Sequence, residues 1–136
     1  MSADIGFEVK LNRPYDDALE MTKAALKAEG FGVLTSIDVK ATMKEKLDVE
    51  FRPYTILGAC NPPLAHRALT QDAVAGLLLP CNVTVESEGS SASIVRIANP
   101  RTIFSVGSLE NNPEITAVAE EAHLQLERVA EALLAS

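Results

Sequence analysis

The chain has 136 residues, of which 47% are hydrophobic and 23% are charged, and its formal net charge is −7 at pH 7. This length predicts one domain over residues 1–136, and this composition is typical of a soluble globular protein. The acidic balance argues against a nucleic-acid partner, which needs a basic face, and no apolar run approaches the ~20 residues of a membrane span.

The chain carries two cysteines, and its first ten residues, MSADIGFEVK, show no basic segment followed by an apolar stretch. Without an export signal, such cysteines are expected to be free thiols in a reducing compartment. We therefore expect a cytoplasmic protein whose partners include neither a membrane nor a nucleic acid.

The first third of the chain predicts two strands and two helices. Residues 5–12 alternate between apolar and polar side chains, which is typical of a strand with one buried face. A helix is expected over residues 15–29, with Gly30 well placed to end it. Residues 31–39 alternate again and predict a second strand, and residues 41–48 predict a short helix.

The middle of the chain predicts a strand that leads directly into a helix. The third strand is expected over residues 54–60, where Gly58 indicates a close approach by another element or a ligand. Asn61 and Pro62 are typical of a helix start, with Asn as the N-cap, and this helix is expected to reach about Ala73.

The last part of the chain predicts a hairpin and a long helix. Three consecutive leucines at residues 77–79 indicate a connection that is buried or covers a partner subunit. Residues 81–88 and 91–98 are expected to form the hairpin, followed by a mostly irregular segment over residues 99–112. A final amphipathic helix is expected over residues 113–135.

The predicted order β-α-β-(α)-β-α-β-β-α indicates an α+β fold. We expect a mostly antiparallel sheet with helices packed on one face, and an opposite face left for solvent or a partner. The first helix also allows a crossover between parallel neighbouring strands.

Two long segments carry a resemblance to a known family. Residues 51–65, FRPYTILGACNPPLA, and residues 76–85, GLLLPCNVTV, resemble the domain-of-unknown-function family 302. The resemblance implies a TATA-binding-protein-like arrangement of sheet and flanking helices, and a homodimer. It brings no established activity and no catalytic residue that can be assigned here.

Cys60 is the candidate for thiol chemistry. It ends a predicted strand one residue before a helix, where free backbone N–H groups and the helix dipole lower the pKa of a thiol. His66 on the following helix is placed to approach the sulfur. The alternative is a small buried apolar residue, which is what free cysteines usually are.

Cys81 is the second thiol, set between Pro80 and Asn82. Together with Cys60 and either His66 or His123 it could ligate a soft metal, and the two cysteines could form a transient disulfide. However, about 20 residues separate them, which fits no standard zinc spacing, and no CxxC motif is present. No metal or cofactor is therefore assigned.

The two Cys-Asn dipeptides suggest one shared pocket. Asn61, unless it serves only as a cap, and Asn82 would be polar walls of that pocket. The candidate ligand-binding residues are therefore Cys60, Asn61, His66, Cys81 and Asn82.

Three functions follow from these features. The first is a small-molecule or metal binding module with the pocket around Cys60 and Asn61 and around Cys81 and Asn82. The second is a thiol-dependent enzyme or redox carrier that uses Cys60. The third is a homodimeric structural or partner-binding protein in which a second chain covers residues 77–79 and the open sheet face.

Overall fold

The structure, a computed structural model, describes residues 5–136. The five strands are β1 (Gly6–Leu11), β2 (Gly32–Asp38), β3 (Tyr54–Cys60), β4 (Cys81–Ser87) and β5 (Ser93–Ala98). The helices are α1 (Tyr15–Ala28), α2 (Val39–Leu47), α3 (Pro62–Gln71), α4 (Pro100–Ile103) and α5 (Pro113–Leu134), with 3-10 turns η1 (Ala73–Leu78) and η2 (Gly107–Leu109).

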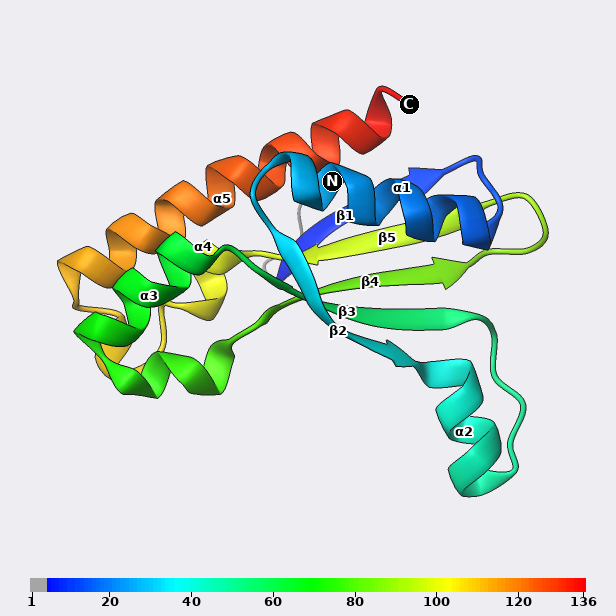
Figure 1. Cartoon of the computed structure of the whole chain (residues 1–136), viewed down its shortest axis with the longest axis horizontal. Coiled ribbons are helices and arrows are strands. Elements are labelled where there is room, and N and C mark those ends of the chain that lie inside the picture. The colour runs from blue at the N-terminus through cyan, green and yellow to red at the C-terminus, as the bar shows by residue number, and fades with distance from the viewer. Residues whose placement is uncertain (1–4) are drawn as a thin grey trace.

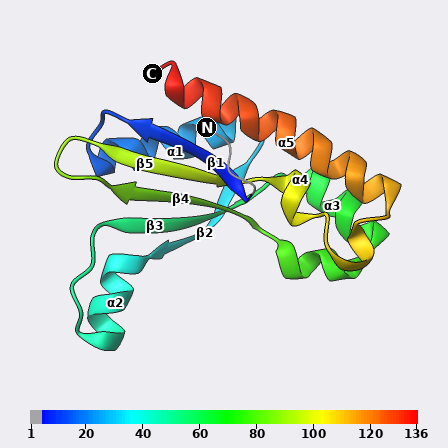
Figure 2. The same cartoon turned by 180° about the vertical axis from the view of Figure 1, so that it is seen from behind.

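One five-stranded sheet of order β1-β5-β4-β3-β2 organises the molecule, and all four strand pairings are antiparallel. α1 and α5 lie along the same side of the sheet (Figure 1), and from behind the strands stand in front of α1 (Figure 2). The predicted α+β fold is confirmed. α1 does not connect parallel neighbouring strands, the alternative that the sequence allowed, because it leads from β1 at one edge of the sheet to β2 at the other.

The core lies between the sheet and these two helices. Phe7, Val9 and Leu11 of β1 are buried and alternate with exposed or half-buried residues, as expected for a strand with one wet face. The inward stripe of α5 repeats every three or four residues: Ile115, Val118, Ala119, Ala122, Leu126, Val129, Ala130 and Leu133. Within residues 5–136, no helix has the length and apolar character needed to cross a membrane.

The segment over residues 99–112 is more ordered than expected. The Asn99 side chain caps α4 by accepting a hydrogen bond from Arg101 N at 3.0 Å, and Asn112 caps α5. Phe104 is buried in the core, whereas the side chain of Val106 is 51% exposed. Short capped turns of this kind lack the apolar periodicity that reveals longer helices.

β2 and α2 form an arm, a name used here for these two elements together. β2 is an edge strand that pairs only with β3, and α2 projects away from the sheet in both views (Figures 1 and 2). None of the nine residues of α2 is buried. The arm therefore leaves apolar side chains uncovered, as described below.

Candidate functional site

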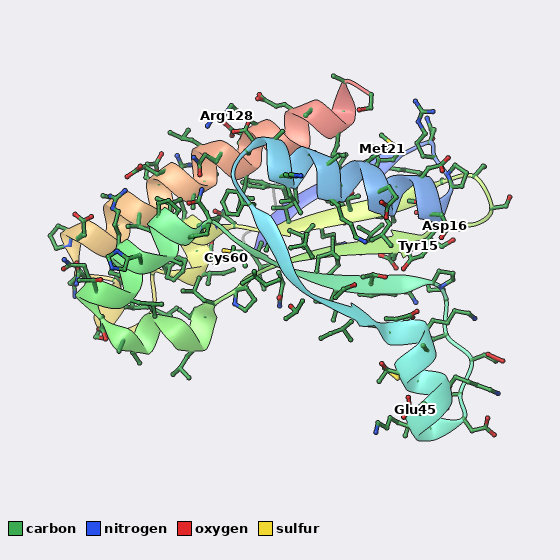
Figure 3. The ribbon with its side chains drawn as sticks, in the orientation of Figure 1. Tyr15, Asp16, Met21, Glu45, Cys60 and Arg128 are labelled. Atoms are coloured by element: carbon green, nitrogen blue, oxygen red, sulfur yellow. The ribbon has the colours of Figure 1, made fainter. Side chains whose placement is uncertain are left out.

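The two cysteines lie together at one end of the sheet, but the space between them is almost filled. Cys60 ends β3 beside α3 (Figure 3). Cys81 begins β4 and pairs with Ala59, the residue before Cys60. Both thiols line a cavity of only about 20 Å³. That volume holds about one water molecule, so this cavity does not admit a ligand of metabolite size.

Burial makes Cys81 a poor nucleophile at neutral pH. Its side chain is buried, and desolvation, with a smaller contribution from nearby Cys60, raises the pKa of the Cys81 thiol to about 11. The thiolate is the reactive form of cysteine. Cys60 is half-buried, and both cysteines are free.

Asn61 serves as a helix cap. Its Oδ1 accepts a hydrogen bond from Leu64 N at 3.3 Å, and its Nδ2 donates to Gln125 Oε1 on α5 at 3.0 Å. The first bond begins α3, and the second ties that beginning to α5. Both ends of the Asn61 amide are thus engaged within the protein, as the capping alternative expects.

Asn82 and His66 lie away from the two thiols. Asn82 follows the buried Cys81 on the same strand and faces the opposite side of the sheet, because successive strand residues alternate between faces. His66 is exposed on α3, whose buried residues are Leu64 and Ala68. The five candidate residues therefore do not converge on one pocket.

The structure brings no metal-ligand set together around the thiols. Within residues 5–136, no group of three or more His, Cys, Asp or Glu side chains is placed to hold a metal ion. His123 is buried on α5, where its Nδ1 lies 3.2 Å from Asn99 Oδ1 and its ring makes an edge contact with Phe7. It acts as a packed residue that bonds to a neighbour.

A much larger cavity, of about 760 Å³, lies on the face of the sheet opposite α1 and α5, called here the open face. We call it the open-face cavity. Its lining residues come from β1, β3, β4, β5, η1 and the chain segments next to them: Ile5, Gly6, Phe7, Glu8, Tyr54, Leu77, Leu78, Leu79, Pro80, Cys81, Asn82, Thr84, Arg96, Ile97, Ala98 and Ile103. Its volume is within the range of small-molecule sites.

A network of four charged side chains, called here the charge network, crosses the open face. Arg96 Nε donates to Glu8 Oε2 at 2.9 Å, and Arg96 also donates to Glu86, whose other oxygen accepts from Arg52 Nε at 2.5 Å. The strand register places these groups side by side, since Arg96 of β5 is the partner of both Glu8 of β1 and Thr84 of β4. The charges of the two guanidinium groups and the two carboxylates thus cancel.

Glu86 is the buried member of the charge network, with a side chain only 6% exposed. Burial by itself raises the pKa of this carboxyl, but hydrogen bonds from Arg96 and Arg52 outweigh that effect and hold the pKa below its ordinary value. Glu86 therefore stays ionised at neutral pH and fixes Arg96 beside the cavity.

Thr84 lies between Arg96 and Ile56 in the strand register. Its Oγ1 is buried and has no hydrogen-bond partner among residues 5–136. Buried hydroxyl groups are normally bonded. One hydroxyl group at the floor of the cavity thus lacks a hydrogen-bond partner among the described residues.

Sequence reasoning named Cys81 and Asn82, which line this cavity, but it missed the charge network, although the signal for that network was present. Glu8 and Arg96 occupy the polar positions of two alternating strands, and such positions were expected to face solvent or a partner. The pairing of β1 with β5 places Glu8 and Arg96 side by side in the wall of the cavity, and local periodicity does not specify this pairing.

Comparisons with known proteins agree with the fold. The family model described as Domain of unknown function DUF302 matches residues 7–133. The crystal structure of an uncharacterized conserved protein DUF302 from Bacillus stearothermophilus is similar over 96% of this chain and 98% of that chain, with a TM-score of 0.83 and 27% sequence identity. No curated protein matches the chain. These similarities confirm the resemblance carried by residues 51–65 and 76–85, and they attach no activity to it.

Proposed function

Because the chain belongs to the family described as Domain of unknown function DUF302, which brings no activity with it, we propose a function from the open-face cavity. The protein is a small-molecule binding module, and its ligand lies on the open face against β1, β4 and β5. The observation that carries this proposal is the cavity itself, about 760 Å³ in volume, with mostly apolar walls and a few polar groups on its floor.

The site differs from the pocket that the sequence suggested around both Cys-Asn dipeptides. Cys81 and Asn82 line the open-face cavity, whereas Cys60, Asn61 and His66 do not. Among the two ligand classes considered, a small molecule is favoured, since the large volume suits it and the described side chains offer no metal-ligand cluster.

The test is to fill the cavity. Ala98 lines it from β5, and Ala98→Phe places an aromatic ring on the floor. We expect the uncharged dye Nile red to bind the wild type saturably and to bind Ala98→Phe at least about tenfold more weakly, a loss of ~1.4 kcal/mol. Ile94→Phe is the matched control, because Ile94 lies on β5 with the same facing but outside the cavity lining. Absence of saturable binding, or equal binding by Ala98→Phe, contradicts the proposal.

A homodimer is the second candidate, and the arm favours it. Leu34 and Ile37 on β2 are 68% and 49% exposed, and Leu47 and Val49 at the far end of α2 are also exposed. An isolated nine-residue helix is unstable in water unless packing supports it. A second copy whose β2 pairs with this β2 would cover the apolar side chains and satisfy the sheet edge.

The remaining expectations concern the setting of the protein. Two free cysteines suit the reducing cytoplasm, which we propose as its location. A net charge of −7 makes nucleic acid an unsuitable partner. A redox pair of Cys60 and Cys81 has less support, since Cys81 is buried and its pKa is raised, and Cys60 stays the candidate for thiol chemistry by a single cysteine.

A further inference from the structure

The charged groups of the open-face cavity compensate each other. Among the described residues that line it, 5–136, only Glu8 and Arg96 carry a charge, and they form an ion pair with 2.9 Å between Glu8 Oε2 and Arg96 Nε. Arg96 has a second carboxylate partner, Glu86, which also forms an ion pair with Arg52. The part of the wall that the described residues form therefore offers no charge without a partner.

The remaining walls are arranged with an apolar side and a polar side. The residues of the apolar side come from η1, the segment after it, the start of β1 and α4: Ile5, Leu77, Leu78, Leu79, Pro80 and Ile103. The pair Gly6 and Ala98 lies next to this side, and the pair Glu8 and Arg96 lies two residues further along the same strands. A ligand in the cavity thus meets apolar side chains at one end and an ion pair at the other.

This arrangement disfavours an ionised ligand. A carboxylate that accepts from a remaining N–H of Arg96 lies beside the carboxylates of Glu8 and Glu86, which repel it, and an ammonium group that donates to Glu8 lies beside the guanidinium of Arg96. An ion placed among apolar walls without a counter-charge loses hydration that nothing replaces. An uncharged group that both donates and accepts can instead accept from Arg96 and donate to Glu8 while the pair stays together.

Resting on the proposed function, we infer that the ligand is an uncharged amphiphile: an apolar body against the residues 77–80 side, and an amide-like head that bonds the Arg96–Glu8 pair. Both members of the pair are specificity-determining residues. Thr84, next to Arg96 in the register, has the buried unpaired hydroxyl that marks this end of the cavity as polar.

The first experiment compares three ligands that share an eight-carbon chain and differ in the head group. Octanamide, octanoate and octylammonium compete with Nile red for the wild-type protein at pH 7. We expect octanamide to bind at least about tenfold more tightly than either ion. Equal or tighter binding of octanoate or octylammonium overturns the inference while leaving the proposed function in place. No binding of Nile red or of any of the three overturns the proposed function, and the inference with it.

The second experiment changes the ion pair. Glu8→Gln removes the carboxylate that occupies the outer side of Arg96, so octanoate should gain at least about fivefold relative to octanamide. Lys10→Gln is the matched control, since Lys10 lies on the same face of β1, pairs with Glu88 and does not line the cavity. Its ligand ranking should equal that of the wild type. An unchanged ranking in Glu8→Gln, or the same shift in Lys10→Gln, overturns the role of the pair.

Discussion

Glu86 combines a nearly buried carboxylate with two guanidinium partners on the face of the sheet opposite α1 and α5. Because Arg96 and Arg52 hold its pKa below the ordinary value, ionised Glu86 stabilises the folded state. This contribution is fully present above the unfolded pKa near ~4.3 and is lost as pH falls through the lower folded pKa.

Glu86→Gln should therefore destabilise the protein most at neutral pH. We expect a loss of about 1–3 kcal/mol in the free energy of unfolding at pH 7, and a smaller loss near ~pH 3, where the wild-type carboxyl is protonated too. Urea denaturation at the two pH values measures both. Glu88→Gln, which removes an exposed ion pair with Lys10 from the same hairpin, should change little at either pH. A loss in Glu86→Gln that does not shrink in acid would contradict the assigned role.

The two thiols should differ in their reaction with alkylating reagents. Cys81 is 6% exposed and has a pKa raised to about 11, whereas Cys60 is partly exposed. We expect one cysteine per chain to react with N-ethylmaleimide at pH 7.5, and Cys60→Ser to remove most of that reaction. The rate at Cys81 should rise with pH toward 11, because the thiolate is the nucleophile. Equal rates at both cysteines, measured by mass spectrometry of the peptides, would contradict this assignment.

For single residues, the sequence predicted those interactions whose partners lie close together along the chain. The role of Asn61 as a cap was predictable, because its partner Leu64 is three residues away. The opposite orientations of the Cys81 and Asn82 side chains also follow from strand alternation, and both residues nevertheless line the open-face cavity. By contrast, the Arg52–Glu86 pair joins side chains 34 residues apart. Its formation requires the register between β3 and β4, which no local pattern supplies.

At the level of the elements, β3 contains a position, Gly58, where its neighbours leave no room for a side chain. A Cβ added at Gly58 would overlap Thr35 Oγ1 on β2 and lie 2.8 Å from Pro80 Cγ. The sequence indicated a close approach at Gly58, and the structure identifies the approaching groups as Thr35 and Pro80. The bulge of β2 between Val33 and Thr35 lies beside this position.

Gly58→Ala should consequently be destabilising by about 1–3 kcal/mol, because the rigid Pro80 ring and the Thr35 side chain must shift. Gly32→Ala is the matched control on the adjacent strand, where an added Cβ meets no atom within 4 Å. We expect it to change stability by no more than about 0.5 kcal/mol. Denaturant midpoints of the two variants give the comparison. Equal stability of Gly58→Ala and wild type would contradict this prediction, because it would show that Thr35 of β2 and Pro80 move aside without a cost in stability.

The long elements were predictable from periodicity, and the short ones were not. β1 and α5 repeat their apolar residues with periods near two and 3.6 over their whole length, so their faces could be assigned without tertiary information. The order of strands could not, because β1 pairs with β5 across most of the chain. For that reason the sequence could indicate single parts of the open-face cavity, such as Cys81 and Asn82, but not its assembly from four strands, η1 and α4.

At the scale of the whole molecule, the two proposed surfaces lie apart on the sheet. The open-face cavity takes its lining from β1, β5, β4 and β3, while the arm extends from β2 at the far edge. Filling the cavity and breaking a β2 contact should therefore act independently, as changes without shared partners usually do.

The oligomeric state tests the arm. Ile37 lies on edge strand β2 with 49% of its side chain exposed, and a lysine there introduces a charge into an apolar contact and discourages strand pairing. We expect the wild type to sediment as a dimer at micromolar concentrations and Ile37→Lys as a monomer. Leu124→Lys on α5 is the matched control, because Leu124 is similarly exposed but lies outside the arm. A monomeric wild type would contradict the proposed dimer. A dimer that survives Ile37→Lys would show that the two copies associate through another surface, and the nine-residue helix of the arm would then have no partner to support it.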